Sequence, residues 1–245
     1  MIGHQRLTAA DVALTTVFTA YYALLGLVKI SPIIGLPGQA ITAAAIVAPI
    51  IGMLLGPYLG TLSAFLGGII GFSLGSLSPL SFVSGIASTF CAGMIRTGKR
   101  AVAVGVYLVL LVLFAFFPNV GPAWVFPLEL WFQILGLIIL ASPFQSIASR
   151  FLGSKSNTRL LLGFFVICLV STLAGQIAGS LVFEAFATDP ATVIGSWLTL
   201  TALYPVERII IAVAAAFVGS SLARVLGSTH LPPTVINREK PGTHL

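Results

Sequence analysis

Residues 38–71 read GQAITAAAIVAPIIGMLLGPYLGTLSAFLGGIIG and contain no charged side chain. A helix needs roughly 20 apolar residues to cross the hydrocarbon core of a bilayer, and this run is longer. Gly56 and Pro57 divide it, because proline has no N–H with which to continue a preceding helix and glycine tolerates a tight turn. We therefore predict two membrane helices joined by a tight turn at this pair.

Small residues recur at four-residue intervals through the same run. The pairs are Gly52 and Gly56, Gly56 and Gly60, Gly60 and Ala64, Ala64 and Gly68, and Gly67 and Gly71. Such spacing lets helix backbones approach closely in lipid. The pattern is typical of packing inside a protein, and it would also suit a smooth surface on which a partner slides.

The whole chain shares this apolar character. Of its 245 residues, 58% are hydrophobic and 7% are charged, and the mean hydropathy is +1.08. Soluble domains carry about 25% charged residues, and continuous runs without alternation argue against a barrel. We expect an all-α polytopic transmembrane bundle of six to eight membrane segments. The eight candidate segments are residues 7–29, 39–55, 58–76, 79–95, 101–117, 128–149, 160–184 and 196–225.

Basic residues gather on one side of these segments. They are Arg6; Arg96, Lys99 and Arg100; Arg150, Lys155 and Arg159; and Arg224, Arg238 and Lys240. Cytoplasmic loops are enriched in Lys and Arg, so both termini are expected in the cytoplasm. This topology explains the net charge of +6 without a nucleic-acid partner. In a six-segment alternative, one hairpin around 76–95 is re-entrant.

The same pattern defines the domain organisation and location. Residues 1–227 are expected to form a single multi-pass domain surrounded by lipid in the plasma membrane. Residues 228–245 are polar and are expected to be a disordered cytoplasmic tail.

The residues that several classes of function require are absent from the apolar segments. The histidines His4, His230 and His244 lie in the tails, and acidic clusters are absent. Neither a metal site, a cofactor site nor an enzyme is therefore expected. Cys91 and Cys168 are expected to be small buried apolar residues. The sequence contains no phosphate-binding loop, so any use of ATP must come from partners.

Polar residues in membrane segments are costly and mark candidate sites. The predicted topology places Lys29, Trp131, Gln133 and Trp197 near the outer side, although tryptophan there is also typical of interface anchors and Lys29 could snorkel. The residues that we expect to contact a substrate are Gln39, Asn119, Trp124, Glu129, Gln176, Glu184, Tyr204, Glu207 and Arg208. Glu129 and Glu184 could instead be solvated at helix ends, and Gln176 could bond across helices.

Glu207 and Arg208 follow Pro205, which leaves two predictions for their depth. Proline favours the first turn of a helix, so the last span could begin there and place the pair at the outer mouth. If the helix instead runs unbroken from Ser196, the pair lies about 18 Å further along. A structural ion pair with another helix is the alternative to a ligand contact.

The first segment carries a second small-residue stripe. Ala9 and Ala13 are four residues apart, as are Thr16 and Ala20, so all four share a helix face. This face could pack inside the protein or bind a partner.

The chain resembles the S component of energy-coupling factor (ECF) transporters. The resemblance rests on this first helix, the loop SPIIGLPGQ, the turn LLGPYLGTLSAFLGG, the helix end AGMIRTGKR and the last helix after LYPVER. It implies capture of a vitamin or similar micronutrient at the outer face, beneath the loop after the first helix. It also implies that Ala9, Ala13, Thr16 and Ala20 contact a membrane coupling subunit, which works with ABC-type ATPases. Family members usually have six helices, whereas we count eight segments.

The most direct functional prediction is therefore a substrate-binding subunit that is not an enzyme. A stand-alone ion-coupled secondary transporter or channel is the alternative, because Glu207 and interrupted segments are also typical of that class. Partner dependence discriminates between the two. The tryptophans and charges near the outer side are compatible with a small aromatic or heterocyclic solute.

Overall fold

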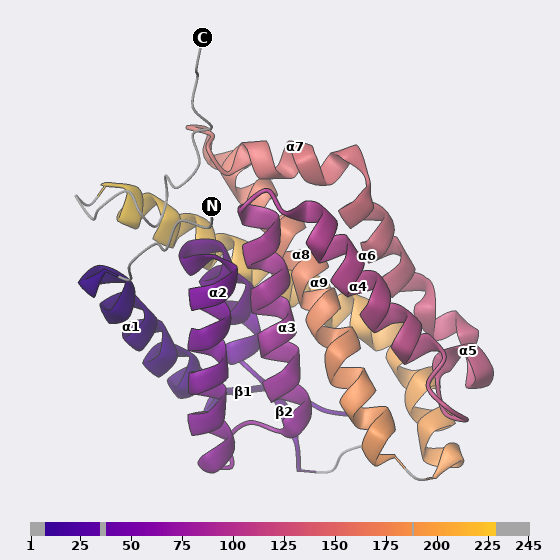
Figure 1. Ribbon diagram of the computed structural model, residues 1–245. Coiled ribbons are helices and arrows are strands. Elements are labelled where there is room, and N and C mark those ends of the chain that lie inside the picture. Colours follow the sequence, from indigo (N-terminus) through magenta and orange to yellow (C-terminus); the bar gives the residue numbers. More distant parts are fainter. Residues whose placement is uncertain (1–7, 35–37, 188, 229–245) are drawn as a thin grey trace, which may run out of the picture.

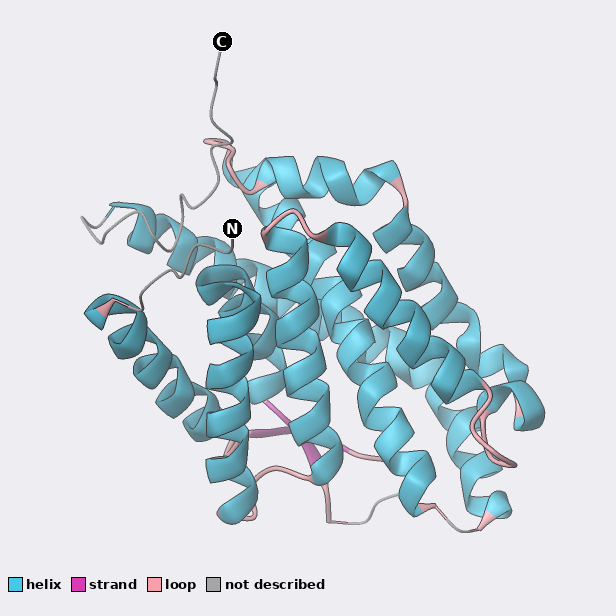
Figure 2. Ribbon diagram, viewed as in Figure 1, coloured by secondary structure: helices cyan, strands magenta, loops and turns pink. Residues whose placement is uncertain are grey.

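Helices form nearly all of the computed structural model, which describes residues 8–34, 38–187 and 189–228 (Figures 1 and 2). The expected tail at 229–245 lies outside the described residues. The elements are α1 (Ala9–Leu25), β1 (Lys29–Pro32), β2 (Ala40–Thr42), α2 (Ala44–Ser73), α3 (Pro79–Arg96), α4 (Arg100–Ala115), α5 (Pro122–Val125), the 3₁₀-helix η1 (Pro127–Leu130), α6 (Trp131–Ala141), α7 (Pro143–Phe151), α8 (Asn157–Phe186) and α9 (Pro190–Ser228). The all-α prediction is confirmed.

The predicted turn at Gly56 and Pro57 divides α2 into two halves that fold back on each other. Gly56 has φ 80° and ψ 179°, which is not helical and is accessible to glycine. A Cβ atom on Gly60 would lie 3.0 Å from the Cα atom of Gly52. In a straight helix these residues would be about 12 Å apart. The pair of residues therefore makes the hairpin that the sequence predicts.

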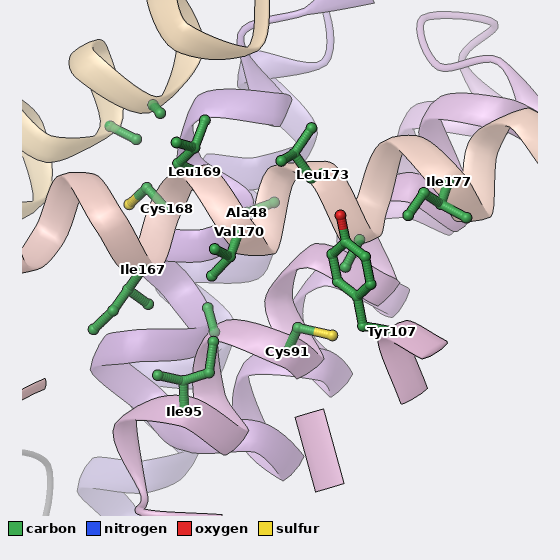
Figure 3. Packing of buried hydrophobic residues seen from close by; sticks show 14 of the residues in the cluster. Ala48, Cys91, Ile95, Tyr107, Ile167, Cys168, Leu169, Val170, Leu173 and Ile177 are labelled. Carbon is green, nitrogen blue, oxygen red and sulfur yellow. The ribbon is translucent and has the colours of Figure 1, made fainter. Parts of the chain in front are cut away.

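Small residues in α2 and α8 let both helices approach α3 closely. A Cβ atom on Gly52 would lie 2.0 Å from the Thr89 carbonyl oxygen, and one on Gly175 would lie 2.6 Å from the Ser84 carbonyl oxygen. The glycine pattern of α2 thus serves packing inside the protein rather than a sliding surface. Figure 3 shows side chains of α8 interleaved with those of α3 and α4. Cys91 and Cys168 are buried there, as predicted.

Basic side chains tie together one end of the bundle. Arg100, at the start of α4, donates from Nη1 to the Ser142 carbonyl (3.0 Å) and to Ser146 Oγ (2.9 Å) at the α6–α7 corner. Arg224, near the end of α9, donates to the Lys155 carbonyl (2.8 Å) before α8. The β1–β2 hairpin and the α2–α3 connection lie at the opposite end (Figure 1). The predicted basic clusters of the described residues therefore share one end of the molecule.

Three predicted segments differ from the observed helices. Segments 7–29 and 39–55 extend too far, because residues 29–32 and 40–42 pair as the antiparallel strands β1 and β2. Segment 128–149 is broken between α6 and α7, which meet at an angle of 69°. The residue before a proline is disfavoured in the α conformation, and Ser142 before Pro143 has ψ 163°.

Only some helices meet the length and composition expected of a membrane span. Among the described residues, three helices are long and apolar enough to cross a membrane: Ala44–Ser73, if its two halves on either side of Gly56 are counted together, Asn157–Phe186 and Pro190–Leu226. The bent pair of α6 and α7 would make a fourth. Candidate spans therefore bend at Gly56 in α2 and between α6 and α7, whereas α3 is continuous from Pro79 to Arg96.

Candidate functional site

A cavity lies at the end of the bundle that carries the β1–β2 hairpin. Its walls come from α1, the hairpin, the start of α2, and α3, α8 and α9. Its volume is about 60 Å³. On this measure, one water needs about 10–15 Å³. The cavity therefore has room for about four to six waters, or for a small organic group of similar size.

Each of the three long walls is one stripe of a helix. On α9 the lining residues Trp197, Leu200, Tyr204 and Arg208 are three or four positions apart, so they share a face. On α3 the stripe is Ser81, Ser84 and Ser88, and on α8 it is Thr172, Gln176 and Ser180. Two walls therefore present hydroxyl and amide groups, and the third presents aromatic rings and one guanidinium group.

The hairpin closes the cavity with apolar side chains. Ile33 and Ile41 pack against Ile211, one turn beyond Arg208 on α9. Tyr22 reaches in from α1 and is 1% exposed. Its hydroxyl occupies the space above Gly85, where a Cβ atom would lie 1.7 Å away. Described residues after the first helix therefore line one wall of the cavity.

Arg208 supplies the positive charge of the site. Its Nη2 lies 3.4 Å from Glu207 Oε2, and its guanidinium carbon lies 5.5 Å from the centre of the Tyr204 ring. Its Nε is buried without a hydrogen-bond partner. Helix α9 runs unbroken through Pro205, so the prediction that the last helix begins at Pro205 is wrong. The pair lies well inside the helix, and Arg208 faces the cavity.

A buried polar network lies beside the cavity. Gln133 Nε2 donates to Gln176 Oε1 and to Glu129 Oε1, each at 3.4 Å, and Thr201 Oγ1 lies 2.8 Å from Glu129 Oε2. Gln176 lines the cavity, whereas Glu129 and Gln133 do not. The prediction that Gln176 bonds across helices is confirmed, and it also reaches the cavity.

The two carboxyl groups expected near helix ends are not solvated. Glu129 is 1% exposed and Glu184 is 2% exposed. Both oxygens of Glu184 lack a hydrogen-bond partner among the described residues, and Glu184 does not line the cavity. The prediction that Glu129 and Glu184 are solvated at helix ends is therefore wrong.

Three other predicted substrate contacts lie on the surface. Gln39 is exposed beside β2, and Asn119 is exposed in the loop after α4, where it adopts φ 65°. Trp124 is 64% exposed and packs edge to face on Phe116. The structure does not bring Gln39, Asn119 or Trp124 to the cavity, and the exposed Trp124 suits an interface anchor. Lys29 is exposed on β1 rather than at a helix end.

Trp197 and the hydroxyl groups are the part of the site that sequence reasoning did not choose. Trp197 is fully buried, contacts Phe114 and Phe183 edge to face, and donates from Nε1 to the Val120 carbonyl (3.3 Å). It is therefore no interface anchor. The signal for the hydroxyl groups was present, because Ser81, Ser84 and Ser88 follow helical spacing in an otherwise apolar segment.

The stripe on α1 faces outward. Ala9, Ala13, Thr16 and Ala20 are all exposed, whereas the buried face of α1 carries Asp11, Thr15, Phe18, Thr19 and Tyr22. Packing inside the protein, one of the two predicted roles of this stripe, is thus excluded for these four positions. The stripe leaves a smooth outer surface on α1.

Comparison with protein-family models, curated proteins and solved structures finds no match to this chain.

Proposed function

We propose that the chain is the substrate-binding membrane subunit of an ECF-type ABC importer that captures a vitamin or similar micronutrient. The observation that carries the proposal is the cavity beneath the β1–β2 hairpin, at the end opposite the basic residues. Under the positive-inside rule that end faces outward. The proposed topology has six to eight membrane segments in the plasma membrane and both termini in the cytoplasm.

The chemistry of the cavity supports binding rather than catalysis. Its polar groups are the hydroxyls of α3 and α8, the amide of Gln176 and the guanidinium of Arg208. No group of three or more metal-ligating side chains occurs among the described residues. Such a lining can orient a solute through hydrogen bonds and apolar contact. Energy for uptake then comes from partner ATPases.

The outward face of α1 supports a membrane partner. Small side chains permit close helix approach in lipid, where packing drives association. Ala13 and Ala20 are exposed and lie on one face of α1, so a coupling subunit can contact both. Figure 1 shows α1 at one edge of the bundle, with its outer side uncovered.

A stand-alone ion-coupled transporter remains the second candidate. It is favoured by Glu129 and Glu184, two buried carboxyl groups without a cationic hydrogen-bond or ion-pair partner among the described residues. Ionisable residues within membrane segments often mark ion pathways.

Purification from native membranes in mild detergent tests the proposal. We expect the tagged protein to recover two ABC-type ATPases and a helical coupling subunit. Ala13→Trp and Ala20→Trp should lose these partners and still bind solute, whereas Gly105→Trp should retain them, because no atom lies within 4 Å of a Cβ at exposed Gly105. Recovery of the protein alone, with gradient-driven uptake in liposomes, would establish the second candidate instead.

A further inference from the structure

Three residues that line the cavity each carry a buried polar atom without a hydrogen-bond partner among the described residues. Ser88 Oγ, Gln176 Nε2 and Arg208 Nε are buried without a hydrogen bond, and their residues are 3%, 4% and 4% exposed. An unsatisfied buried polar group is destabilising, and more so when it is charged. Two of the three can only donate a hydrogen bond. A ligand with acceptor atoms would satisfy them.

The charge of the lining has one sign. Arg208 is the one charged residue among the described residues that line the cavity. Glu207 contacts it at 3.4 Å but is not part of the lining. Glu207 contacts only Nη2 of the guanidinium, and Nε is left without an acceptor among the described residues. The side that faces the cavity is left for an anion.

The rest of the lining fits a flat apolar group. Trp197 and Phe183 make an edge-to-face pair with ring centres 5.7 Å apart, and both line the cavity. Ile33 and Ile41 of the hairpin are 9% exposed and close the site above Arg208. An apolar group placed here would exchange water or lipid for aromatic and aliphatic contact.

We propose that the cavity binds a small organic monoanion, whose carboxylate pairs with Arg208 and whose apolar body packs on Trp197 and Phe183. Arginine is suited to this task because its planar fork matches a carboxylate. Further acceptor atoms of the solute would face Gln176 and Ser88 on the opposite walls. The inference rests on the proposed function, since it takes this cavity as the substrate site.

Matched acid and amide probes test the charge requirement. The purified protein is melted with benzoate, phenylacetate or 4-phenylbutyrate, and separately with the primary amide of each. With a Kd of about 1 mM, a probe at about 10 mM should raise the melting midpoint by roughly 3–6 °C. We expect at least one acid to do so and its amide to have less than half the effect. Equal effects of acid and amide, or no shift with any acid, would overturn the proposal.

Variants locate the effect at Arg208. Arg208→Gln should remove the preference for the acid, Arg208→Lys should keep part of it, and Arg224→Gln, near the C-terminal end of α9 and outside the cavity lining, should keep it all. If Arg208→Gln does not fold, the acid–amide comparison on the wild-type protein still decides. A preference for the acid without recovered ATPases would support the anion site and refute the importer proposal. Recovery of the ATPases together with a preference for amides would support the importer and refute the anion site.

Discussion

Replacing Gly52 by alanine should separate α2 from α3. The added Cβ would lie 2.0 Å from the Thr89 carbonyl oxygen, 2.9 Å from the Thr89 carbonyl carbon and 3.0 Å from the Gly93 nitrogen. All three are backbone atoms, so no side chain can swing away. Ordinary contact begins at 3.4 Å, which leaves 1.4 Å (3.4 − 2.0) to be relieved by moving a helix. Crowding of this kind costs about 1–3 kcal/mol.

Gly105→Ala is the matched control for this variant. Gly105 also lies in a helix, α4, but no atom lies within 4 Å of its Cβ position. Both variants gain the helix propensity of alanine, worth about 1 kcal/mol, so their difference isolates the crowding. We expect Gly52→Ala to melt about 2–12 °C below Gly105→Ala, at 2–4 °C per kcal/mol.

The assay is thermal unfolding in detergent, followed by tryptophan fluorescence. The displacement should also reach the cavity, because Ala48 and Ser88 line it and Thr89 donates to the Ala48 carbonyl at 2.9 Å. Solute binding by Gly52→Ala should therefore weaken. Equal melting midpoints for the two alanine variants would refute the close approach of α2 and α3.

Two further predictions concern hydrogen bonds outside the cavity. Thr201→Val removes the hydroxyl beside the buried Glu129 carboxyl, so its melting midpoint should fall by the equivalent of about 1–3 kcal/mol; Thr199→Val, whose exposed hydroxyl bonds its own helix, is the control and should not change. At the start of α9, the Thr192 hydroxyl and backbone N–H groups hold the pKa of Asp189 below its usual range. Its stabilising effect is present above the unfolded pKa and lost as the pH falls through the lowered folded value. The protection of the first-turn amides of α9 against exchange, corrected for the intrinsic pH dependence of exchange, should therefore fall in acid for the wild-type protein and vary less with pH for Asp189→Asn; the same pH response in both would contradict this role.

Local chemistry made much of the fold predictable. Gly56 and Pro57 predict the α2 hairpin, because glycine allows a positive φ and proline cannot continue a preceding helix. The β1–β2 hairpin was missed because a short apolar run fits a strand as well as a helix. Pro143 marks the break between α6 and α7, but the continuous apolar run around it favoured a single helix. Pro205, in contrast, lies inside a helix that continues on both sides.

The site was less predictable because it depends on how the helices are rotated about their axes. Glu184 and Gln176 are two turns apart on α8, yet only Gln176 reaches the cavity. Composition marks both as costly residues in an apolar segment, but it does not tell which face meets α3 or α9. For Arg208, the spacing from Trp197 and Tyr204 would have indicated the shared face.

Because the chain is synthesised from its N-terminus, the α2 hairpin and the cavity can form at different times. Gly52 and Gly60 are eight residues apart, so their contact closes a short loop and can form as soon as that segment emerges. Ile33 and Ile211 meet only after nearly the entire chain has been made. The last helix supplies both the guanidinium and the tryptophan of the site. A nascent chain that lacks α9 can therefore form the α2 hairpin but lacks one wall of the cavity.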